Sequence, residues 1–124
     1  MKTIVLASQK GGAGKTTLAA HLAVAAERAG DGPCVLIDTD PQESLAAWWN
    51  CREDEAPAFA PATLKELSDK LAALDKAGFA FALIDTPPAI TESIRAVVAL
   101  ADLVIIPTRP SPHDLRAVGR TVEL

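Results

Sequence analysis

The chain has 124 residues, 49% of them hydrophobic, and a formal net charge of −4 at pH 7. This length fits one domain with a single core, and the negative charge argues against binding nucleic acid through bulk positive charge, although a local basic patch is compatible with it. Cys34 and Cys51 are far apart, which argues against a disulfide scaffold, a zinc site and an iron–sulfur cluster. Residues 1–6 show no signal-peptide pattern, so we expect a soluble cytoplasmic protein with reduced thiols.

Short apolar runs alternate with helical patterns along the chain. Strands are predicted at residues 3–7, 34–37, 79–84 and 103–106, with a weaker one at 58–60. This alternation is typical of βαβ units, so the predicted fold class is α/β, with a mostly parallel sheet flanked by helices.

The first two predicted helices follow the first and second strands. The first covers residues 15–29 with Gly30 in the capping position. For the second, Asp40 is a predicted cap, Pro41 fits the first turn, and Glu43 stands three residues after the cap. That helix is expected to reach about Trp49. The apolar face of the first helix is predicted to hold Leu18, Leu22, Ala25 and Ala29.

Three further helices are predicted. Thr63 and Glu66 form a capping box for the third, which Gly78 ends. The fourth spans about 91–101. The fifth begins with capping-box spacing at Ser111, and the sequence stops inside it.

Residues 10–17, K-G-G-A-G-K-T-T, follow the first strand and open the first helix, which is the context of a phosphate-binding loop. Lys15 is predicted to bridge the β- and γ-phosphates, the Thr16 hydroxyl to coordinate Mg²⁺, and Thr17 to support the α-phosphate. The alternative is a glycine-rich turn with two exposed lysines, but eight matching residues at this place favour the phosphate loop. The backbone N–H groups expected to face phosphate oxygens belong to Gly11, Gly12, Ala13 and Gly14.

The loop departs from the ordinary pattern G-x-x-x-x-G-K-[ST], because Gln9 takes the place of the first glycine. It resembles instead the deviant Walker A motif of the ParA/MinD superfamily of P-loop NTPases. In that family an additional lysine, here Lys10, reaches across a dimer interface to the partner's nucleotide. The resemblance therefore implies a catalytic role in trans for Lys10.

Two aspartates end apolar strands at the edge where open α/β sheets bind ligands. Asp85 resembles the Walker B aspartate, which holds Mg²⁺ through water. Residues 38–42 resemble the switch I segment of the family; we assign Asp40 to the attacking water and Asp38 to support of the metal and of Lys15. Asp40 has a second interpretation as a helix cap, and both can hold. An isolated aspartate can also end a strand merely because the chain turns, but two beside a phosphate loop favour function.

The segment after the last strand lies where the family wraps the adenine ring. Pro110, Ser111 and Pro112 are therefore assigned to adenine binding, whereas Asp114 fits better as the capping partner of Ser111. Trp48 and Trp49 are expected to pack the second helix against the sheet or a partner surface.

Nearly the whole chain resembles small ParA-type partition proteins of plasmids and chromosomes. The resemblance implies ATP and Mg²⁺ as cofactors, slow partner-stimulated hydrolysis, an ATP-dependent homodimer and non-specific DNA binding. It also implies a ParB-type centromere-binding partner and a nucleoid-associated place in the bacterial cytoplasm. The chain is shorter than such proteins, so a truncated chain or a divergent short member is expected, with DNA-binding basic residues mostly beyond it.

Three other functions were weighed. A MinD-like regulator needs a C-terminal amphipathic membrane helix, which is not seen before Leu124, so no membrane partner is expected. An electron carrier like nitrogenase reductase needs cluster cysteines near Asp85, and Cys34 and Cys51 lie elsewhere. A non-hydrolysing ATP-dependent binding module stays open, since sequence does not report turnover.

Overall fold

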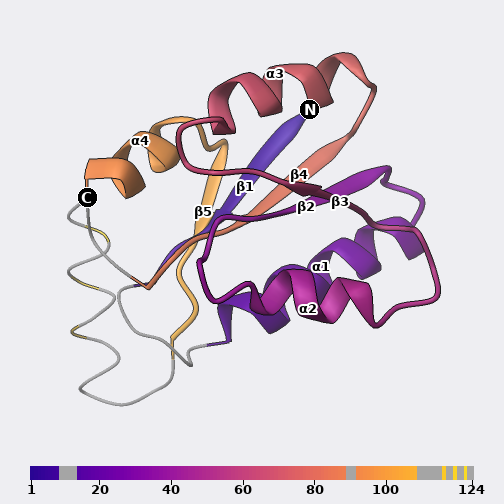
Figure 1. Cartoon of the computed structure of the whole chain (residues 1–124), viewed down its shortest axis with the longest axis horizontal. Coiled ribbons are helices and arrows are strands. Elements are labelled where there is room, and N and C mark those ends of the chain that lie inside the picture. The colour runs from indigo at the N-terminus through magenta and orange to yellow at the C-terminus, as the bar shows by residue number, and fades with distance from the viewer. Residues whose placement is uncertain (9–13, 89–91, 109–115, 117–118, 120–121, 123–124) are drawn as a thin grey trace.

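The computed structural model describes residues 1–8, 14–88, 92–108, 116, 119 and 122. Within these residues one fully parallel sheet has the order β3-β2-β4-β1-β5 (Figure 1). The predicted α/β class is thereby confirmed. The strands are β1 (Lys2–Leu6), β2 (Cys34–Asp38), β3 (Ala58–Pro61), β4 (Phe81–Asp85) and β5 (Leu103–Ile105). The helices are α1 (Lys15–Arg28), α2 (Ser44–Asn50), α3 (Leu67–Lys76) and α4 (Glu92–Ala99).

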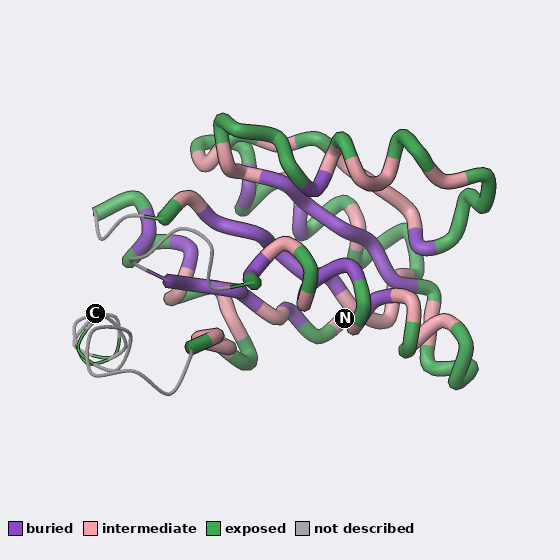
Figure 2. Tube along the Cα trace, turned by 90° about the horizontal axis from the view of Figure 1, so that it is seen from below, coloured by how far each residue is buried: buried purple, intermediate pink, exposed green. Residues whose placement is uncertain are grey.

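Helices cover both faces of the sheet, with α1 and α2 on one side and α3 and α4 on the other (Figure 1). Successive strand side chains point to opposite faces, so each central strand contributes to two cores. The three central strands β1, β2 and β4 form the buried centre of the molecule (Figure 2). Val5, Ile37 and Ile84 belong to the core under α3 and α4, and Leu6, Leu36 and Leu83 to the core under α1 and α2. Each such side chain stabilises the fold by roughly 1.5–3 kcal/mol when fully buried.

The buried face of α1 differs from the predicted one. Ala19, Ala20 and Ala23 are buried against the sheet, whereas Ala25 and Ala29 are exposed. Small side chains let the helix axis approach the strands closely, and the larger leucines lie at the flanks, where they are half-buried. The predicted face was right for Leu18 and Leu22, which pack at the edge of the core, and wrong for Ala25 and Ala29.

The start of α2 also differs from the prediction. The helix begins at Ser44, and the Glu43 N–H donates to the Asp40 carbonyl (2.9 Å) in a separate turn. Glu43 has a left-handed backbone (φ 54), which cannot continue a helix back to Asp40. The N–H of Ala46 in the first turn donates instead to Asp38 Oδ2 (3.0 Å). The side chain that caps α2 is therefore Asp38, not Asp40.

The third and fourth helices form where they were predicted, but they are shorter than predicted. Thr63 Oγ1 accepts a long hydrogen bond from the Glu66 N–H (3.4 Å), but residues 64–66 form a turn and α3 starts at Leu67. Gly78 ends α3 with a φ of 96. The predicted start of the fifth helix at Ser111 lies outside the described residues. None of the helices in the described part of the chain is long and apolar enough to cross a membrane.

Candidate functional site

Part of the predicted site lies outside the described residues. This holds for Lys10, Gly11, Gly12, Ala13, Pro110, Ser111 and Pro112. The other predicted residues are described, and they cluster at the carboxyl edge of the sheet.

The start of α1 forms one wall of this cluster. Gly14 has a φ of 88, a left-handed conformation that favours glycine, and α1 begins directly after it. The first N–H groups of a helix have no partner inside the helix and carry the positive end of its dipole. This end of α1 therefore suits an anion such as a phosphate.

Two side chains from the first turn of α1 meet Asp85 at the end of β4. The Thr16 hydroxyl donates a hydrogen bond of 2.7 Å to Asp85 Oδ2, and Lys15 Nζ lies 3.8 Å from Asp85 Oδ1. Lys15 is only 7% exposed and Asp85 is fully buried. The structure thus brings three predicted site residues into one group.

Lys15 and Thr16 compensate the buried Asp85 carboxylate only in part. Burial raises its pKa above the ordinary value, and the nearby Asp38 and Asp40 carboxylates raise it further. The hydrogen bond from Thr16 and the charge of Lys15 oppose this increase in pKa. Oδ1 of Asp85 is buried without a hydrogen-bond partner among the described residues. A buried carboxylate in this state, beside a threonine hydroxyl, fits the oxygen ligands that Mg²⁺ prefers.

Asp38 lies directly beside Asp85, because the two residues pair in the register of β2 and β4. Its Oδ1 accepts the N–H of Asp40 (3.0 Å) and its Oδ2 accepts the N–H of Ala46 (3.0 Å). Both oxygens are therefore engaged by backbone. Asp38 fixes the loop between β2 and α2 and, through it, the position of Asp40.

Asp40 faces a cavity of about 510 Å³ at the start of α1. Its Oδ1 accepts the N–H of Gln42 (3.0 Å), which holds the side chain within its own turn. The cavity has the size of a small-molecule site. It is lined by Gly14, Lys15, Thr16, Thr17, Asp40, Gln42, Ser44 and Pro88.

Thr39 and Thr86, for which the sequence predicts no contact, hold the strand ends together. The Thr39 hydroxyl and N–H both donate to the Asp85 carbonyl, at 2.7 and 3.0 Å. The Thr86 hydroxyl, fully buried, donates to the Leu6 carbonyl (2.7 Å). The available signal was a threonine directly after each strand-terminal aspartate, where a short hydroxyl can reach the backbone of the adjacent strand.

The arrangement combines a buried lysine, threonine hydroxyls, a helix N-terminus and acidic groups around one cavity. The lysine and the helix end attract a polyanion, while the carboxylates need a cation. A phosphate chain bound together with a divalent cation satisfies both requirements.

Comparison with known proteins agrees with this chemistry. The CobQ/CobB/MinD/ParA nucleotide binding domain matches residues 4–122. "Maintenance of carboxysome distribution protein A" from Gloeobacter kilaueensis is 38% identical over 98% of this chain and 55% of its own length. "Protein ParA" from Rhizobium radiobacter is 31% identical over 100% of this chain and 56% of its own. The chain spans about half the length of these curated relatives.

A solved structure extends the comparison to the fold. The ATP complex of a Cyanothece McdA variant aligns with a TM-score of 0.71 and 26% identity, over 99% of this chain and 62% of that one. Taken with the match over residues 4–122, this likeness and the site geometry show that the chain belongs to the CobQ/CobB/MinD/ParA nucleotide-binding family.

Proposed function

We propose that this chain binds ATP with Mg²⁺ in the cavity at the start of α1, hydrolyses it slowly, and acts as a nucleotide-dependent dimer switch that positions a large cellular cargo. The observation that carries the proposal is the convergence of Lys15 and Thr16 on the buried Asp85. A fully buried carboxylate with one oxygen that has no hydrogen-bond partner among the described residues is costly to the fold, so its place beside Lys15 favours a functional role.

The described residues divide the work as follows. Lys15 would hold the β- and γ-phosphates, and Thr16 and Asp85 would hold Mg²⁺, which would offset the charge of the transferring phosphoryl group. Asp40 would orient the attacking water from its place in the cavity wall. Asp38 would support the site by fixing the loop that carries Asp40.

The remaining assignments stay proposals from the resemblance. Residues 11–13 would cradle the phosphates, Lys10 would act across the dimer interface, and residues 110–112 would contact the adenine. The dimer would bind DNA non-specifically and respond to a ParB-type partner, with some of these contacts made by parts beyond this chain.

We do not restrict the proposed cargo to plasmids or chromosomes. The names of the relatives include carboxysome distribution and chromosome partitioning. A switch that cycles between a DNA-bound dimer and a free monomer serves any large cargo that carries its stimulating partner, which is why the site alone does not select the cargo.

The test combines nucleotide binding, phosphate release and solution mass, each measured with and without Mg²⁺. Lys15→Ala should weaken ATP binding by roughly tenfold or more, because a charge-assisted contact is lost. Asp40→Ala should keep ATP binding and lose most hydrolysis. Lys76→Ala, an exposed lysine of α3, is the matched control and should behave as the wild type.

Either of two results would defeat parts of the proposal. ATP binding without hydrolysis or dimerisation would leave an ATP-dependent binding module in place of a switch. Unchanged binding in Lys15→Ala would overturn the placement of the nucleotide itself.

A further inference from the structure

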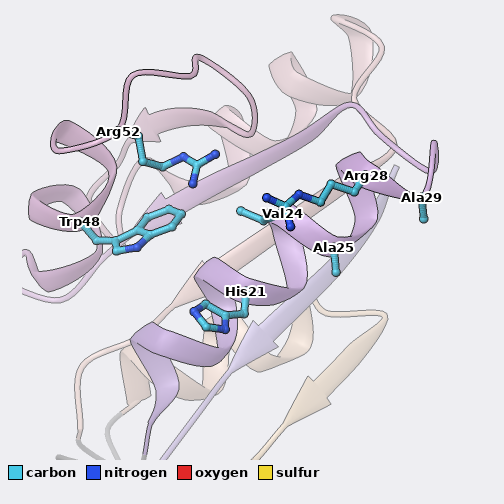
Figure 3. Close-up of a pocket in the computed structure, with 7 residues that line it drawn as sticks. All are labelled: His21, Val24, Ala25, Arg28, Ala29, Trp48 and Arg52. Atoms are coloured by element: carbon cyan, nitrogen blue, oxygen red, sulfur yellow. The ribbon is translucent and has the colours of Figure 1, made fainter.

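A second cavity lies on the outer surface of α1 and α2, separate from the nucleotide cavity. Its volume is about 710 Å³, and its walls include His21, Val24 and Arg28 from α1, Trp48 from α2, and Arg52 just after α2 (Figure 3). Two arginines, a histidine and a tryptophan in one cavity offer both cationic and flat apolar contacts. None of these five residues is used by the proposed nucleotide chemistry.

The two arginines converge on the cavity, where Arg52 has a loose ion pair with the exposed Asp54 at 3.6 Å. Figure 3 shows the Arg28 and Arg52 side chains extending toward one another from opposite walls. In the described part of the chain Arg28 has no carboxylate partner, and the Arg52 Nε is buried with no hydrogen-bond acceptor. Like charges that converge in this way repel each other unless an anion binds between them.

Arg52 is nevertheless held in place. Its guanidinium lies 4.9 Å from the centroid of the Trp48 ring, and its Nη2 donates to the Ala56 carbonyl (3.2 Å). The Trp48 ring, the Ala56 carbonyl and the Asp54 carboxylate together hold the guanidinium in one orientation at the cavity wall. The group is therefore pre-oriented for an acidic ligand, which reduces the entropy lost on binding.

The cavity continues into a second hollow that adds acidic residues to the two arginines. This hollow, of about 380 Å³, shares Arg28 and Arg52 with the first, and its other charged residues are Glu27, Asp54 and Glu55. The Glu27 carboxylate already accepts the Cys34 N–H (2.7 Å), but Asp54 is exposed and only loosely paired with Arg52, at 3.6 Å. The groove as a whole is therefore positive in the first hollow, while the second hollow combines the two arginines with three carboxylates.

We propose that this groove is a docking site for a peptide segment of a partner protein. The segment would place an acidic side chain between Arg28 and Arg52, an apolar side chain against Val24 and Trp48, and a basic side chain near Asp54 and Glu55. A nucleic-acid backbone fits less well, because its phosphates would be repelled by the acidic residues of the second hollow. The inference does not depend on the proposed nucleotide function.

The groove and the nucleotide cavity are lined by the same faces of α1 and α2, one helical turn apart. Thr17 and Ser44 line the nucleotide cavity, and His21 and Trp48, each four residues later, line the groove. Residues four apart lie on the same side of a helix. A bound segment would therefore contact the two helices whose first turns border the nucleotide.

The experiment selects peptides from a random library displayed on phage against the full chain, with counter-selection against the Arg28→Glu, Arg52→Glu double variant. Surviving peptides should combine Asp or Glu, an apolar residue, and Lys or Arg. As synthetic peptides they should bind the wild type roughly tenfold or more tightly than the double variant, since a charge-assisted pair is lost. Arg95→Glu, an exposed arginine on the opposite helical layer, should bind as the wild type.

A charge-reversed peptide serves as a control that the double Glu variant is folded. Replacing the acidic residues of a selected peptide by lysine should restore binding to the double Glu variant, which requires that variant to be folded. Bound peptide should also shift the NMR signal of the Trp48 indole more than that of Trp49, whose N–H is held by the Pro57 carbonyl.

Four outcomes would overturn the proposal. The first is that no peptide survives counter-selection, and the second is that the survivors lack acidic residues. A DNA duplex that binds the wild type and is released by Arg28→Glu would assign the groove to nucleic acid. A concentration-dependent dimer without nucleotide that Arg28→Glu dissociates would assign it to a second copy of this chain.

Discussion

The hydroxyl of Thr16 donates a 2.7 Å hydrogen bond to Oδ2 of Asp85, which joins the first turn of α1 to the end of β4 across 69 positions of sequence. The same carboxylate has its other oxygen buried without a hydrogen-bond partner among the described residues. Burial of this carboxylate costs more than its contacts with Thr16 and Lys15 return, as its raised pKa indicates, and its Oδ1 is an oxygen that we propose as a ligand of Mg²⁺.

The first prediction follows from this cost. Asp85→Asn should be more stable to heat than the wild type without nucleotide, by roughly 1–3 kcal/mol in the free energy of unfolding. The substitution removes a buried charge whose desolvation outweighs its contacts with Thr16 and Lys15, as the direction of its pKa indicates. The same variant should lose Mg²⁺-dependent ATP hydrolysis. Calorimetry and phosphate release test the two effects, with the exposed Asp69→Asn as control.

The effect of pH on stability gives an independent check. Folding raises the pKa of Asp85 above its ordinary value of 3.8. Between pH 3.8 and the raised pKa, the folded chain therefore binds more protons than the unfolded chain. The contribution of Asp85 to the free energy of unfolding should therefore fall as pH rises through this window, and Asp85→Asn should lack that component. A stability difference between the two proteins that does not grow with pH would contradict this account.

The second prediction separates the two acidic residues of the loop after β2. Asp38→Ala removes the acceptor for two backbone N–H groups and should destabilise the fold by about 1–3 kcal/mol. Asp40→Ala loses one exposed contact to Gln42 and should cost less than about 1 kcal/mol. Urea unfolding measures both, and equal losses would refute the assignment of Asp38 as the cap of α2.

The third prediction concerns the cysteines. Burial, together with the charges of Glu27 and Asp31, raises the pKa of Cys34 to about 11, whereas Cys51 is exposed. Since the thiolate is the reactive form, a thiol reagent near neutral pH should label Cys51 quickly and Cys34 only on unfolding. Mass spectrometry counts the labels, and Cys51→Ser should show none in the native state.

Stability at high pH should follow from the same shift. The unfolded Cys34 thiol loses its proton near pH 9.0 and the folded one near 11, so the contribution of Cys34 to stability should fall as pH rises between these values. Cys34→Ala should remove this component. Rapid native labelling of Cys34 would show that β2 is more open than the structure indicates.

The fourth prediction tests how the edge strand β3 is held. The Trp49 ring stacks on Phe59 at 5.6 Å and its Nε1 donates to the Pro57 carbonyl (2.7 Å). Trp49→Phe keeps a ring but loses the donor, and should cost about 1 kcal/mol while increasing hydrogen exchange in β3. Trp48→Phe, whose ring faces the groove, should leave this exchange unchanged.

Local sequence patterns predicted most strands and the ends that carry function. Runs such as Val35-Leu36-Ile37 favour a buried strand, and an aspartate followed by a turn residue ends it, so Asp38 and Asp85 were placed at strand ends from sequence alone. The phosphate loop is likewise predicted from one short segment; of its residues, Gly14, Lys15, Thr16 and Thr17 are described, and they lie at the start of α1. Even the weak pattern at Ala58 proved to be a strand.

Local sequence patterns could not predict contacts between segments that are far apart in the chain. Asp40 has the ideal spacing for a cap, yet Asp38 takes that role, because pairing of β2 with β4 fixes Asp38 where the first turn of α2 arrives. Similarly, the close packing of α1 on the sheet selects its alanine face over the larger residues.

The sequence by itself determined the order of strands and helices, the phosphate loop and the acidic strand ends, since each depends on neighbours in the chain. Only the tertiary structure decided that Thr16 and Lys15 meet Asp85, that Thr39 binds its carbonyl, and that Arg28 and Arg52 share a groove. These relations join residues far apart in sequence, and they arise from strand pairing and helix packing, whose geometry depends on the whole core.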